Sequence, residues 1–160
     1  MSNGAVFDRY ELGPLVGSGA YGRVYHAIDR ATGLPVAVKQ VGPTTPIRRE
    51  ITALLALRLP GVVRLLDEGP WGDGHVLVMS WVDGEPFPGH GAGHSVGDDP
   101  GPGPGTDPDA VSAVGLALLD ILDRIHQAGV VHRDLKPPNV LVDPRGRPTV
   151  LDLGLARGDG

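Results

Sequence analysis

Three side chains that carry oxygen ligands follow one another at fixed intervals near the end of the chain. Asn139 comes five residues after Asp134, and Asp152 comes eighteen residues after Asp134. Between Asn139 and Asp152, two short apolar runs separated by a turn at residues 143–146 are typical of a β-hairpin. Because a hairpin brings its ends together, we expect Asn139 and Asp152 to lie side by side, with Asp134 left to orient a hydroxyl group. An amide oxygen beside a carboxylate suits Mg²⁺, which prefers oxygen ligands and often binds phosphate too. An ordinary hairpin with polar ends is the alternative.

A glycine-rich stretch, GSGAYG at residues 17–22, lies near the start of the chain. The runs at 10–16, 23–28 and 35–41 predict three strands, and their short connections predict antiparallel pairing. The glycines therefore form a hairpin loop, whereas a dinucleotide-binding fingerprint leads from a strand into a helix. Glycine lets backbone N–H groups approach a phosphate closely. Glycine-rich hairpins are also common without any ligand.

The next segment predicts a helix from residue 45 to residue 59, with Thr45 as N-cap and Pro46 in the first turn. Its apolar stripe consists of Ile47, Ile51, Leu54, Leu55 and Leu59. Glu50 lies beside this stripe and can point towards the sheet, although a solvated glutamate is the simpler interpretation. Two further strands are predicted at 61–67 and 75–81, joined by a Gly/Pro/Trp turn.

Residues 84–108 change the composition abruptly, with eight Gly and six Pro among twenty-five residues. Such a segment buries too little apolar surface to offset its ordering entropy, so we predict a flexible insertion. A second helix is predicted at 108–128, with Gly129 as its C-cap. Its apolar stripe consists of Val111, Val114, Leu118, Ile121, Leu122 and Ile125.

The composition excludes several classes of protein. The net charge is −5 and no basic run exceeds two residues, which argues against a nucleic-acid surface. The 160 residues contain no cysteine, which fits a reducing cytoplasm, and neither a signal peptide nor a membrane span is indicated. Twelve of the fourteen basic residues are Arg, so Lys39 and Lys136 are the only lysines. A compact ammonium group is not interchangeable with a guanidinium group.

Taken in order, the motifs are GSGAYGRV (17–24), VAVK (36–39), the Arg-Glu pair at 49–50, HRDLKPPN (132–139) and DLG (152–154). This set resembles a protein kinase of the serine/threonine type, and the resemblance covers residues 10–157. It implies an α+β fold. Residues 10–83 would form an N-lobe of five antiparallel strands and one helix. Residues 84–108 would be the insertion, and 109–160 a partial C-lobe with one long helix, the catalytic loop and the hairpin.

The resemblance also implies a role for each site residue. Asp134 would accept or orient the proton of the substrate hydroxyl group, and Lys136 would steady the γ-phosphate of ATP. Lys39 would hold the α- and β-phosphates and pair with Glu50, while Asn139 and Asp152 would hold Mg²⁺. The nucleotide would further contact Gly17, Ser18, Gly19, Ala20, Tyr21, Gly22, Val24, Ala37, Met79, Ser80, Val82 and Leu141. Of these, Val24 and Ala37 would sandwich the adenine, Met79 would guard the back pocket, and residues 80–82 would offer backbone hydrogen bonds.

The sequence departs from the family pattern in several places. Lys39 and Glu50 are only eleven residues apart, and Leu153 stands where the family usually has Phe. Pro138 before Asn139 and Ser80 in the hinge are milder changes. The sequence also has no activation loop or large substrate-binding helices after Arg157. We therefore expect a marginally stable or self-associating chain, or a missing C-terminal region.

Three functions remain open from the sequence. The leading one is an ATP-dependent kinase that acts on Ser or Thr of a protein. The second is a kinase-like nucleotide-binding or regulatory module without turnover. The third is a small-molecule phosphotransferase.

Overall fold

The computed structural model describes residues 5–19, 22–89, 108–132, 135–151 and 157–158. The chain divides into two compact units, each built from two segments. Unit 1 comprises Met1–Leu55 and Val63–Trp81, and unit 2 comprises Ala56–Val62 and Val82–Gly160.

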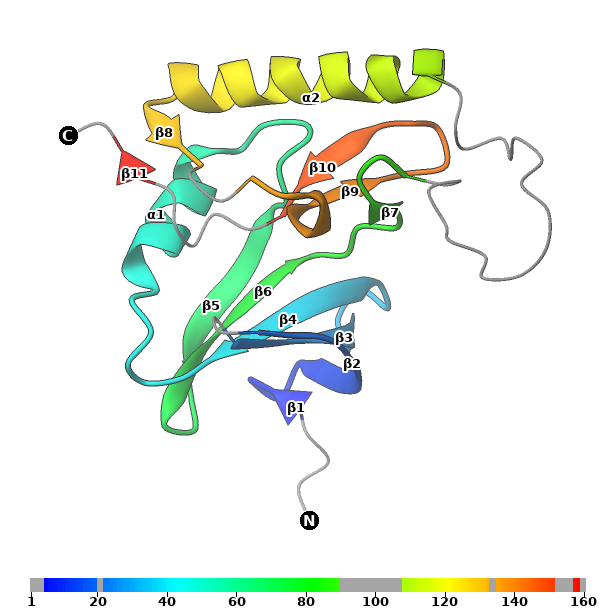
Figure 1. Cartoon of the computed structure of the whole chain (residues 1–160). Helices are drawn as coiled ribbons and strands as arrows, with labels where there is room; N and C mark the ends of the chain where they lie inside the picture. The colour runs from blue at the N-terminus through cyan, green and yellow to red at the C-terminus, as the bar shows by residue number, and fades with distance from the viewer. Residues whose placement is uncertain (1–4, 20–21, 90–107, 133–134, 152–156, 159–160) are drawn as a thin grey trace. The chain divides into compact units, whose positions relative to one another are not determined.

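Unit 1 contains an antiparallel sheet of six strands in the order β1-β2-β3-β4-β6-β5, and helix α1 (Figure 1). The strands are β1 (Ala5–Val6), β2 (Tyr10–Gly19), β3 (Gly22–Asp29), β4 (Pro35–Val41), β5 (Leu65–Trp71) and β6 (Gly74–Ser80). The antiparallel N-lobe sheet predicted from the sequence is confirmed, but the number of five strands is wrong. The two-residue strand β1 is the sixth strand. Two residues are too few to show the alternation of apolar and polar residues by which a strand is predicted from sequence.

Strand β5 begins later than the sequence predicts. The expected strand at 61–67 starts with Gly61, but the Gly61 carbonyl accepts a hydrogen bond of 2.8 Å from the Val150 N–H. Val62, the next residue, forms a β-bridge with the same Val150. The pairing of β5 with β6 therefore starts only at Leu65. The Gly-Pro-Trp segment, predicted as a turn, is the end of β5, and the turn itself is at residues 72–73. Pro70 is tolerated there because β5 is an edge strand.

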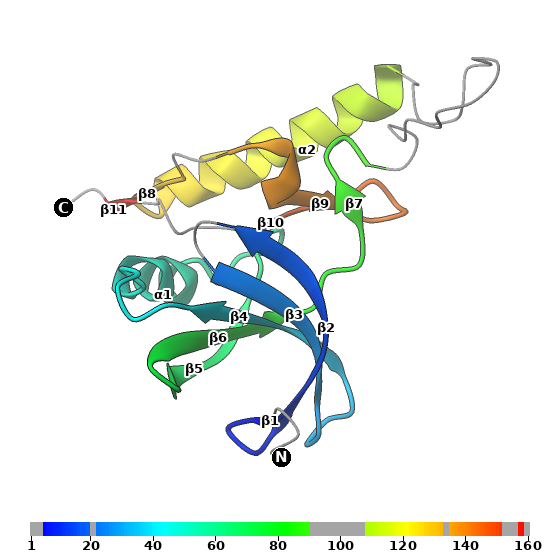
Figure 2. The same ribbon diagram turned by 60° about the horizontal axis from the view of Figure 1, so that its bottom comes forward.

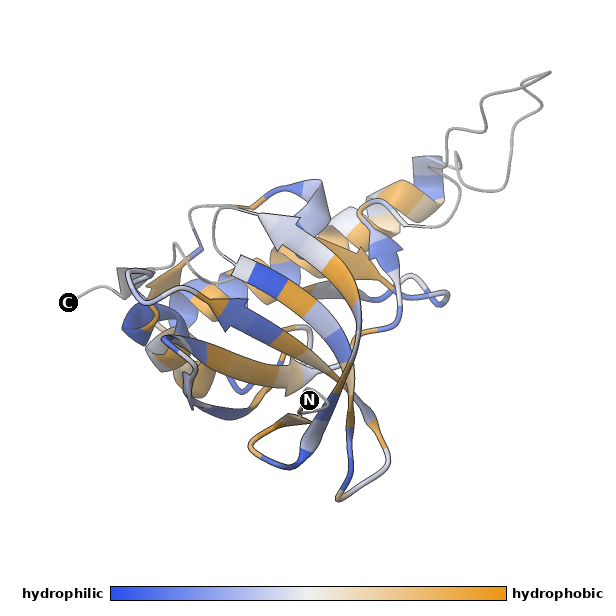
Figure 3. Ribbon diagram, turned by 90° about the horizontal axis from the view of Figure 1, so that it is seen from below, coloured by the Kyte–Doolittle hydropathy of each residue, from blue (hydrophilic) through white to orange (hydrophobic). Residues whose placement is uncertain are grey.

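The sheet of unit 1 is strongly curved (Figure 2). Hydrophobic and hydrophilic segments alternate along its strands, as Figure 3 shows, because successive side chains point to opposite faces. The core cluster consists of Val6, Tyr10, Ala27, Val36, Val38, Val76 and Val78, with Leu12 and Trp71 packed against it. The Phe7 ring lies close to Gly69: a Cβ atom added to Gly69 would be 3.0 Å from the Phe7 ring. The β1–β2 turn therefore contacts β5, at the opposite edge of the sheet.

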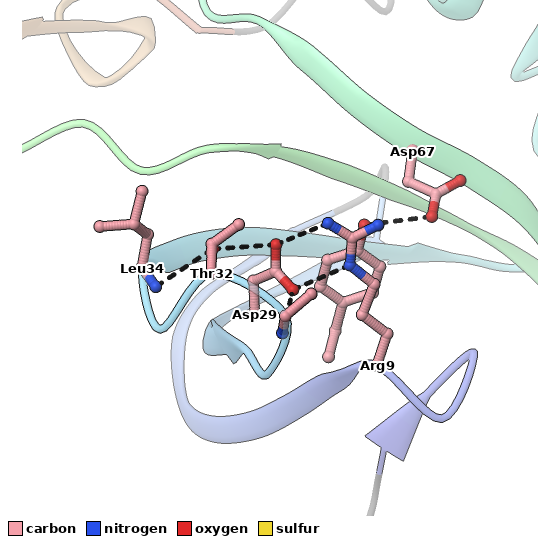
Figure 4. A network of polar contacts seen from close by, with 7 residues as sticks. Arg9, Asp29, Thr32, Leu34 and Asp67 are labelled. Carbon is pink, nitrogen blue, oxygen red and sulfur yellow. Dashed lines mark hydrogen bonds and ion pairs between the residues drawn. The ribbon is translucent and has the colours of Figure 1, made fainter.

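A polar network fastens this N-terminal turn to the rest of the sheet (Figure 4). Arg9 donates two hydrogen bonds of 2.8 Å to the buried Asp29 carboxylate, which also accepts bonds from the Thr32 hydroxyl and the Ala31 N–H. These donors hold the pKa of Asp29 well below its usual range. The hydroxyl of the neighbouring Tyr10 donates to Asp67 at 3.1 Å, and burial with this bond raises its pKa to about 12.

Helix α1 (Arg48–Ala56) is shorter than the predicted helix at 45–59. Its first bond runs from the Ile51 N–H to the Ile47 carbonyl, whereas the Thr45 N–H donates to Gly42 in a preceding turn. Thr45 is therefore not the N-cap. The buried positions on and after this helix are Glu50, Ala53, Leu54 and Leu57. The prediction that Leu55 belongs to the buried stripe is wrong, because Leu55 is 51% exposed.

Unit 2 is built around helix α2 (Pro108–Gln127) and a small sheet in the order β10-β9-β7. Its other elements are β7 (Glu85–Pro86), β8 (Val130–Val131), the 3-10 helix η1 (Pro137–Asn139), β9 (Val140–Val142), β10 (Pro148–Val150) and β11 (Arg157–Gly158). The flexible insertion is predicted to begin at residue 84, but β7 pairs with β9 and the Phe87 N–H donates to Val140. Residues 90–107 of the predicted insertion, with His90 and His94, lie outside the described residues.

Helix α2 begins at the predicted residue and ends one residue before the predicted end, and it has the predicted C-cap. Val114, Ile121 and Ile125 are buried, and Gly129 ends the helix with φ +77° and a bond from its N–H to the His126 carbonyl. Two leucines outside the predicted stripe are exposed, since Leu116 and Leu119 are 68% and 62% exposed. Within the described residues, neither helix has the length and hydrophobicity that crossing a bilayer requires.

Candidate functional site

The strand register of unit 1 places most of the predicted nucleotide contacts on one face of the sheet. Val24 on β3 lies opposite both Gly17 on β2 and Lys39 on β4. Ala37 precedes Lys39 by two residues and lies opposite Met79 on β6. Residues opposite each other, or two apart along a strand, share a face. The core valines of β4 alternate with Ala37 and Lys39 and therefore point to the other face.

Lys39 and Glu50 form a buried ion pair on that face. The Lys39 Nζ lies 2.8 and 3.0 Å from the two carboxylate oxygens of Glu50. Only 8% of the Lys39 side chain and 5% of the Glu50 side chain are exposed. The short connection between β4 and α1 therefore still allows the pair. The alternative interpretation of Glu50 as a solvated helical residue is wrong.

The glycines of the hairpin differ in whether the fold itself requires glycine at their positions. Gly22 has φ +127°, and a Cβ atom there would lie 2.2 Å from the Gln40 carbonyl, so the fold itself requires glycine. Gly17 would bring its Cβ only to ordinary contact at 3.9 Å, and Gly19 has no atom within 4 Å. Packing among the described residues therefore does not explain Gly19. Ser18 is exposed and pairs with Arg23, on the face opposite to Gly17.

The end of β6 carries the predicted hinge residues. Met79 is 7% exposed and contacts the strands on both sides through its register partners Ala37 and Leu65. Ser80 is tied twice to Arg64: its N–H donates to the Arg64 carbonyl at 2.9 Å, and its hydroxyl accepts the Arg64 N–H at 3.1 Å. Val82 is half-buried and already belongs to unit 2. Leu141, also in unit 2, is half-buried on β9.

Asn139 lies at the start of the predicted hairpin in unit 2. Asn139 is 8% exposed, its N–H donates to the Lys136 carbonyl, and its own carbonyl accepts the Leu151 N–H at 2.9 Å. The predicted hairpin is thus confirmed, and its two ends meet at Asn139 and Leu151, the residue directly before Asp152. Its turn is held by Asp143, whose carboxylate accepts backbone and side-chain bonds from Arg147, and these bonds lower the pKa of Asp143.

Lys136 is exposed at the start of η1. Four predicted site residues, Ala20, Tyr21, Asp134 and Asp152, lie outside the described residues. Within the described part of the chain, no group of three His, Asp or Glu side chains could hold a metal ion.

Two features of β2 and β3 were not predicted from the sequence. Val16, directly before Gly17, is 51% exposed, as is its neighbour Leu15. His26 lies opposite Ala37, and its ring meets the Trp81 ring edge-on with the centroids 4.6 Å apart. The alternation from Val24 to His26 along β3 is the signal that would have found His26.

A sheet face with a glycine hairpin at one end and a strand lysine held by a helix glutamate defines a kinase-like fold. The chain belongs to the protein kinase domain family, whose model matches residues 10–158.

Curated relatives agree with this family. The chain is 34% identical to a probable serine/threonine-protein kinase of Streptomyces coelicolor, over 95% of the chain and 23% of the relative. It is 39% identical to cyclin-dependent kinase F-1 of Oryza sativa subsp. japonica, over 95% of the chain and 31% of the relative. It is 36% identical to cell division control protein 2 homolog 3 of Trypanosoma brucei brucei, over 94% of the chain and 48% of the relative. The chain thus spans about a quarter to a half of the length of these relatives.

Proposed function

We propose that this chain provides the nucleotide-binding and catalytic-loop residues of an ATP-dependent serine/threonine protein kinase. The observation that carries the proposal is the buried Lys39–Glu50 pair, on the same sheet face as Gly17, Val24 and Ala37. A buried ammonium group is costly to desolvate, and replacing such a pair with apolar residues is often neutral or stabilising. Its presence here therefore favours a role in binding a polyanion over a role in stability alone.

The glycine hairpin supports ATP as that polyanion. Gly19 has open space around the position of a Cβ atom, so a phosphate group could approach the backbone there. In this proposal, Lys39 binds the α- and β-phosphates, and the glycine hairpin covers them. Val24, Ala37 and Met79 surround the base.

Magnesium would be held by Asn139 and Asp152. The fixed hairpin end fits this assignment, since Asn139 is buried and bonded to Leu151, next to Asp152. An amide oxygen and a carboxylate are suitable ligands for Mg²⁺, which would neutralise charge on the phosphate oxygens when bound.

The proposed reaction transfers the γ-phosphoryl group to a Ser or Thr hydroxyl group of a protein. The hydroxyl oxygen forms the new bond to the γ-phosphorus, and the bond from that phosphorus to the β–γ bridging oxygen breaks, which releases ADP. Asp134 orients the hydroxyl group and accepts its proton, while Lys136 stabilises charge on the transferring group. Positioning and electrostatic stabilisation supply most of the rate in such a transfer.

The test measures ATP binding by calorimetry with Mg²⁺ and phosphate transfer to a generic basic protein. We expect Lys39→Ala and Asp134→Asn each to lower transfer by about 100-fold or more. Gly19→Ala should weaken ATP binding, whereas Gly42→Ala should not. Gly42 is a matched control because it too has open space around its Cβ position and lies in the β4–α1 connection.

Each outcome distinguishes one hypothesis. Transfer that is lost in Asp134→Asn, and in Lys39→Ala under conditions in which tryptophan fluorescence shows that unit 1 is folded, supports the kinase. ATP binding without transfer supports a nucleotide-binding or regulatory module, and absence of ATP binding would overturn the proposal. A cytoplasmic location and self-association through the exposed leucines of α2 stay predictions.

A further inference from the structure

The connection between β4 and α1 carries two adjacent threonines, Thr44 and Thr45, which lie outside helix and strand. Thr44 is exposed and Thr45 is half-buried. Because Thr45 is not the N-cap of α1, its hydroxyl group is not used to hold that helix. Within the described residues, neither threonine hydroxyl makes a hydrogen bond. Both hydroxyl groups are therefore available to a reagent that approaches from solvent.

The hydroxyl groups of the other described Ser and Thr residues are less suited to react. Three of them take part in hydrogen bonds, those of Thr32, Thr52 and Ser80. Three more belong to residues within a strand or a helix, namely Ser18, Ser112 and Thr149. Phosphoryl transfer requires the acceptor oxygen in line with the leaving oxygen. A hydroxyl group in a connection can reach that geometry without disturbing a strand or a helix.

Two arginines follow Thr45 by three and four residues, which is about one helical turn. Arg48 and Arg49 are exposed at the start of α1, and neither forms an ion pair within the part of the chain that the structure describes. Cations are unfavourable in the first turn of a helix, which carries partial positive charge. The acidic residue of that turn, Glu50, is bonded to Lys39. A phosphate group on Thr45, with a charge of about −1.5 to −2, would supply a counter-charge to the two arginines.

We infer that Thr45 is a phosphorylation site of this chain and that its phosphate group pairs with Arg48 and Arg49. The inference rests on the proposed kinase function, because that function supplies the phosphoryl group. Charge-assisted hydrogen bonds from the two guanidinium groups to the phosphate would tie the β4–α1 connection to the first turn of α1. Glu50 lies in that turn, so phosphorylation would steady the residue that positions Lys39.

The reaction is the proposed transfer with Thr45 as the acceptor. The Thr45 hydroxyl oxygen forms a bond to the γ-phosphorus of ATP, the bond from that phosphorus to the β–γ bridging oxygen breaks, and ADP leaves. The hydroxyl proton passes to Asp134 of the copy that catalyses the transfer. Thr45 is favoured over Thr44 because it is one residue nearer to Arg48, and because Pro46 keeps its backbone out of the helical region.

The first test incubates the chain with Mg²⁺ and ATP, in the presence of a generic basic protein. Transfer to the basic protein is measured, and peptide mass spectrometry locates phosphate on the chain itself. We expect phosphate on residue 45 of the wild type. Thr44→Ala, the matched control, should retain this phosphate, and Thr45→Ala should lose it.

The second test compares the stability of the phosphorylated and unmodified chains by urea unfolding with tryptophan fluorescence. Phosphorylation should raise the urea concentration at the unfolding midpoint by about 0.5 M. The double variant Arg48→Gln/Arg49→Gln should abolish this rise. High salt should weaken the rise in the wild type, since salt screens exposed charges.

The outcomes separate the inference from the function on which it rests. Transfer to the basic protein without phosphate on residue 45 would overturn the inference and leave the proposed kinase standing. Phosphate on Thr45 that leaves the midpoint unchanged, or a rise that neither the arginine variant nor salt reduces, would overturn the pairing with Arg48 and Arg49. Absence of transfer to either acceptor would overturn the proposed kinase function and this inference with it.

Discussion

Removing one partner of the Lys39–Glu50 pair should destabilise unit 1 far more than removing both. Lys39→Met leaves the Glu50 carboxylate, only 5% exposed, without the ammonium group 2.8 Å away. Breaking a buried pair in this way costs about 3–5 kcal/mol, and Glu50→Leu should cost a similar amount. The double variant buries two apolar side chains of similar size, which is often neutral or stabilising. Its free energy of unfolding should therefore lie close to that of the wild type.

Urea unfolding followed by tryptophan fluorescence measures this change in stability in unit 1, which contains the ion pair. The chain has two tryptophans, Trp71 and Trp81, and both belong to unit 1. If the free energy of unfolding falls by about 2 kcal/mol per molar urea, each single variant should lower the urea concentration at the unfolding midpoint by about 1.5–2.5 M. The double variant should recover most of that loss, a coupling energy of several kcal/mol. Additive losses in the double variant, or single-variant losses below about 1 kcal/mol, would refute the buried-pair reasoning.

Further predictions concern stability and pH. Gly115→Ala, in open space on α2, should raise the free energy of unfolding by about 1 kcal/mol, measured by urea titration; a loss would contradict the open position. Gly61→Ala should lower the free energy of unfolding by about 1–3 kcal/mol, because φ at residue 61 is +86° and the new Cβ would lie 2.4 Å from Ile121. An unchanged free energy would show that unit 2 can repack around the new methyl group. The pKa of Asp29 is depressed in the folded state, so its stabilisation is present above about pH 4 and is lost as pH falls through the folded pKa. Asp29→Asn should flatten acid unfolding over that window. The pKa of Tyr10 is raised to about 12, so its stabilisation is present below about pH 10 and is lost as pH rises towards 12; Tyr10→Phe should remove that slope.

The parts of the fold that the sequence predicts well depend on local patterns. The alternation along β3 and β4 is enough to place Val24 and Lys39 on a common face. The turn at 143–146 is enough to bring Asn139, at one end of the hairpin, next to Leu151 at the other end. The bounds of helix α2 are predicted to within one residue because its start, its stripe and its C-terminal glycine all agree.

The errors occur where tertiary contacts override the local pattern. The run from Gly61 reads as a strand of the sheet, but Val150 takes its backbone bonds. The residue Leu55 fits a helical stripe, yet Glu50 occupies the buried side of α1 because Lys39 offers it a partner. The bond from Arg64 to the Ser80 hydroxyl joins residues sixteen positions apart, and no sequence pattern encodes it.

The central claim is that a nucleoside triphosphate binds beside Lys39, and a direct measurement is possible because the chain has only two lysines. An ATP analogue with an acyl group on its terminal phosphate transfers that group to a lysine amine held nearby, and peptide mass spectrometry assigns the product to Lys39 or Lys136. We predict acylation of Lys39 that excess ATP abolishes. A Lys39 that stays unmodified, or labelling that ATP does not reduce, would contradict the nucleotide site.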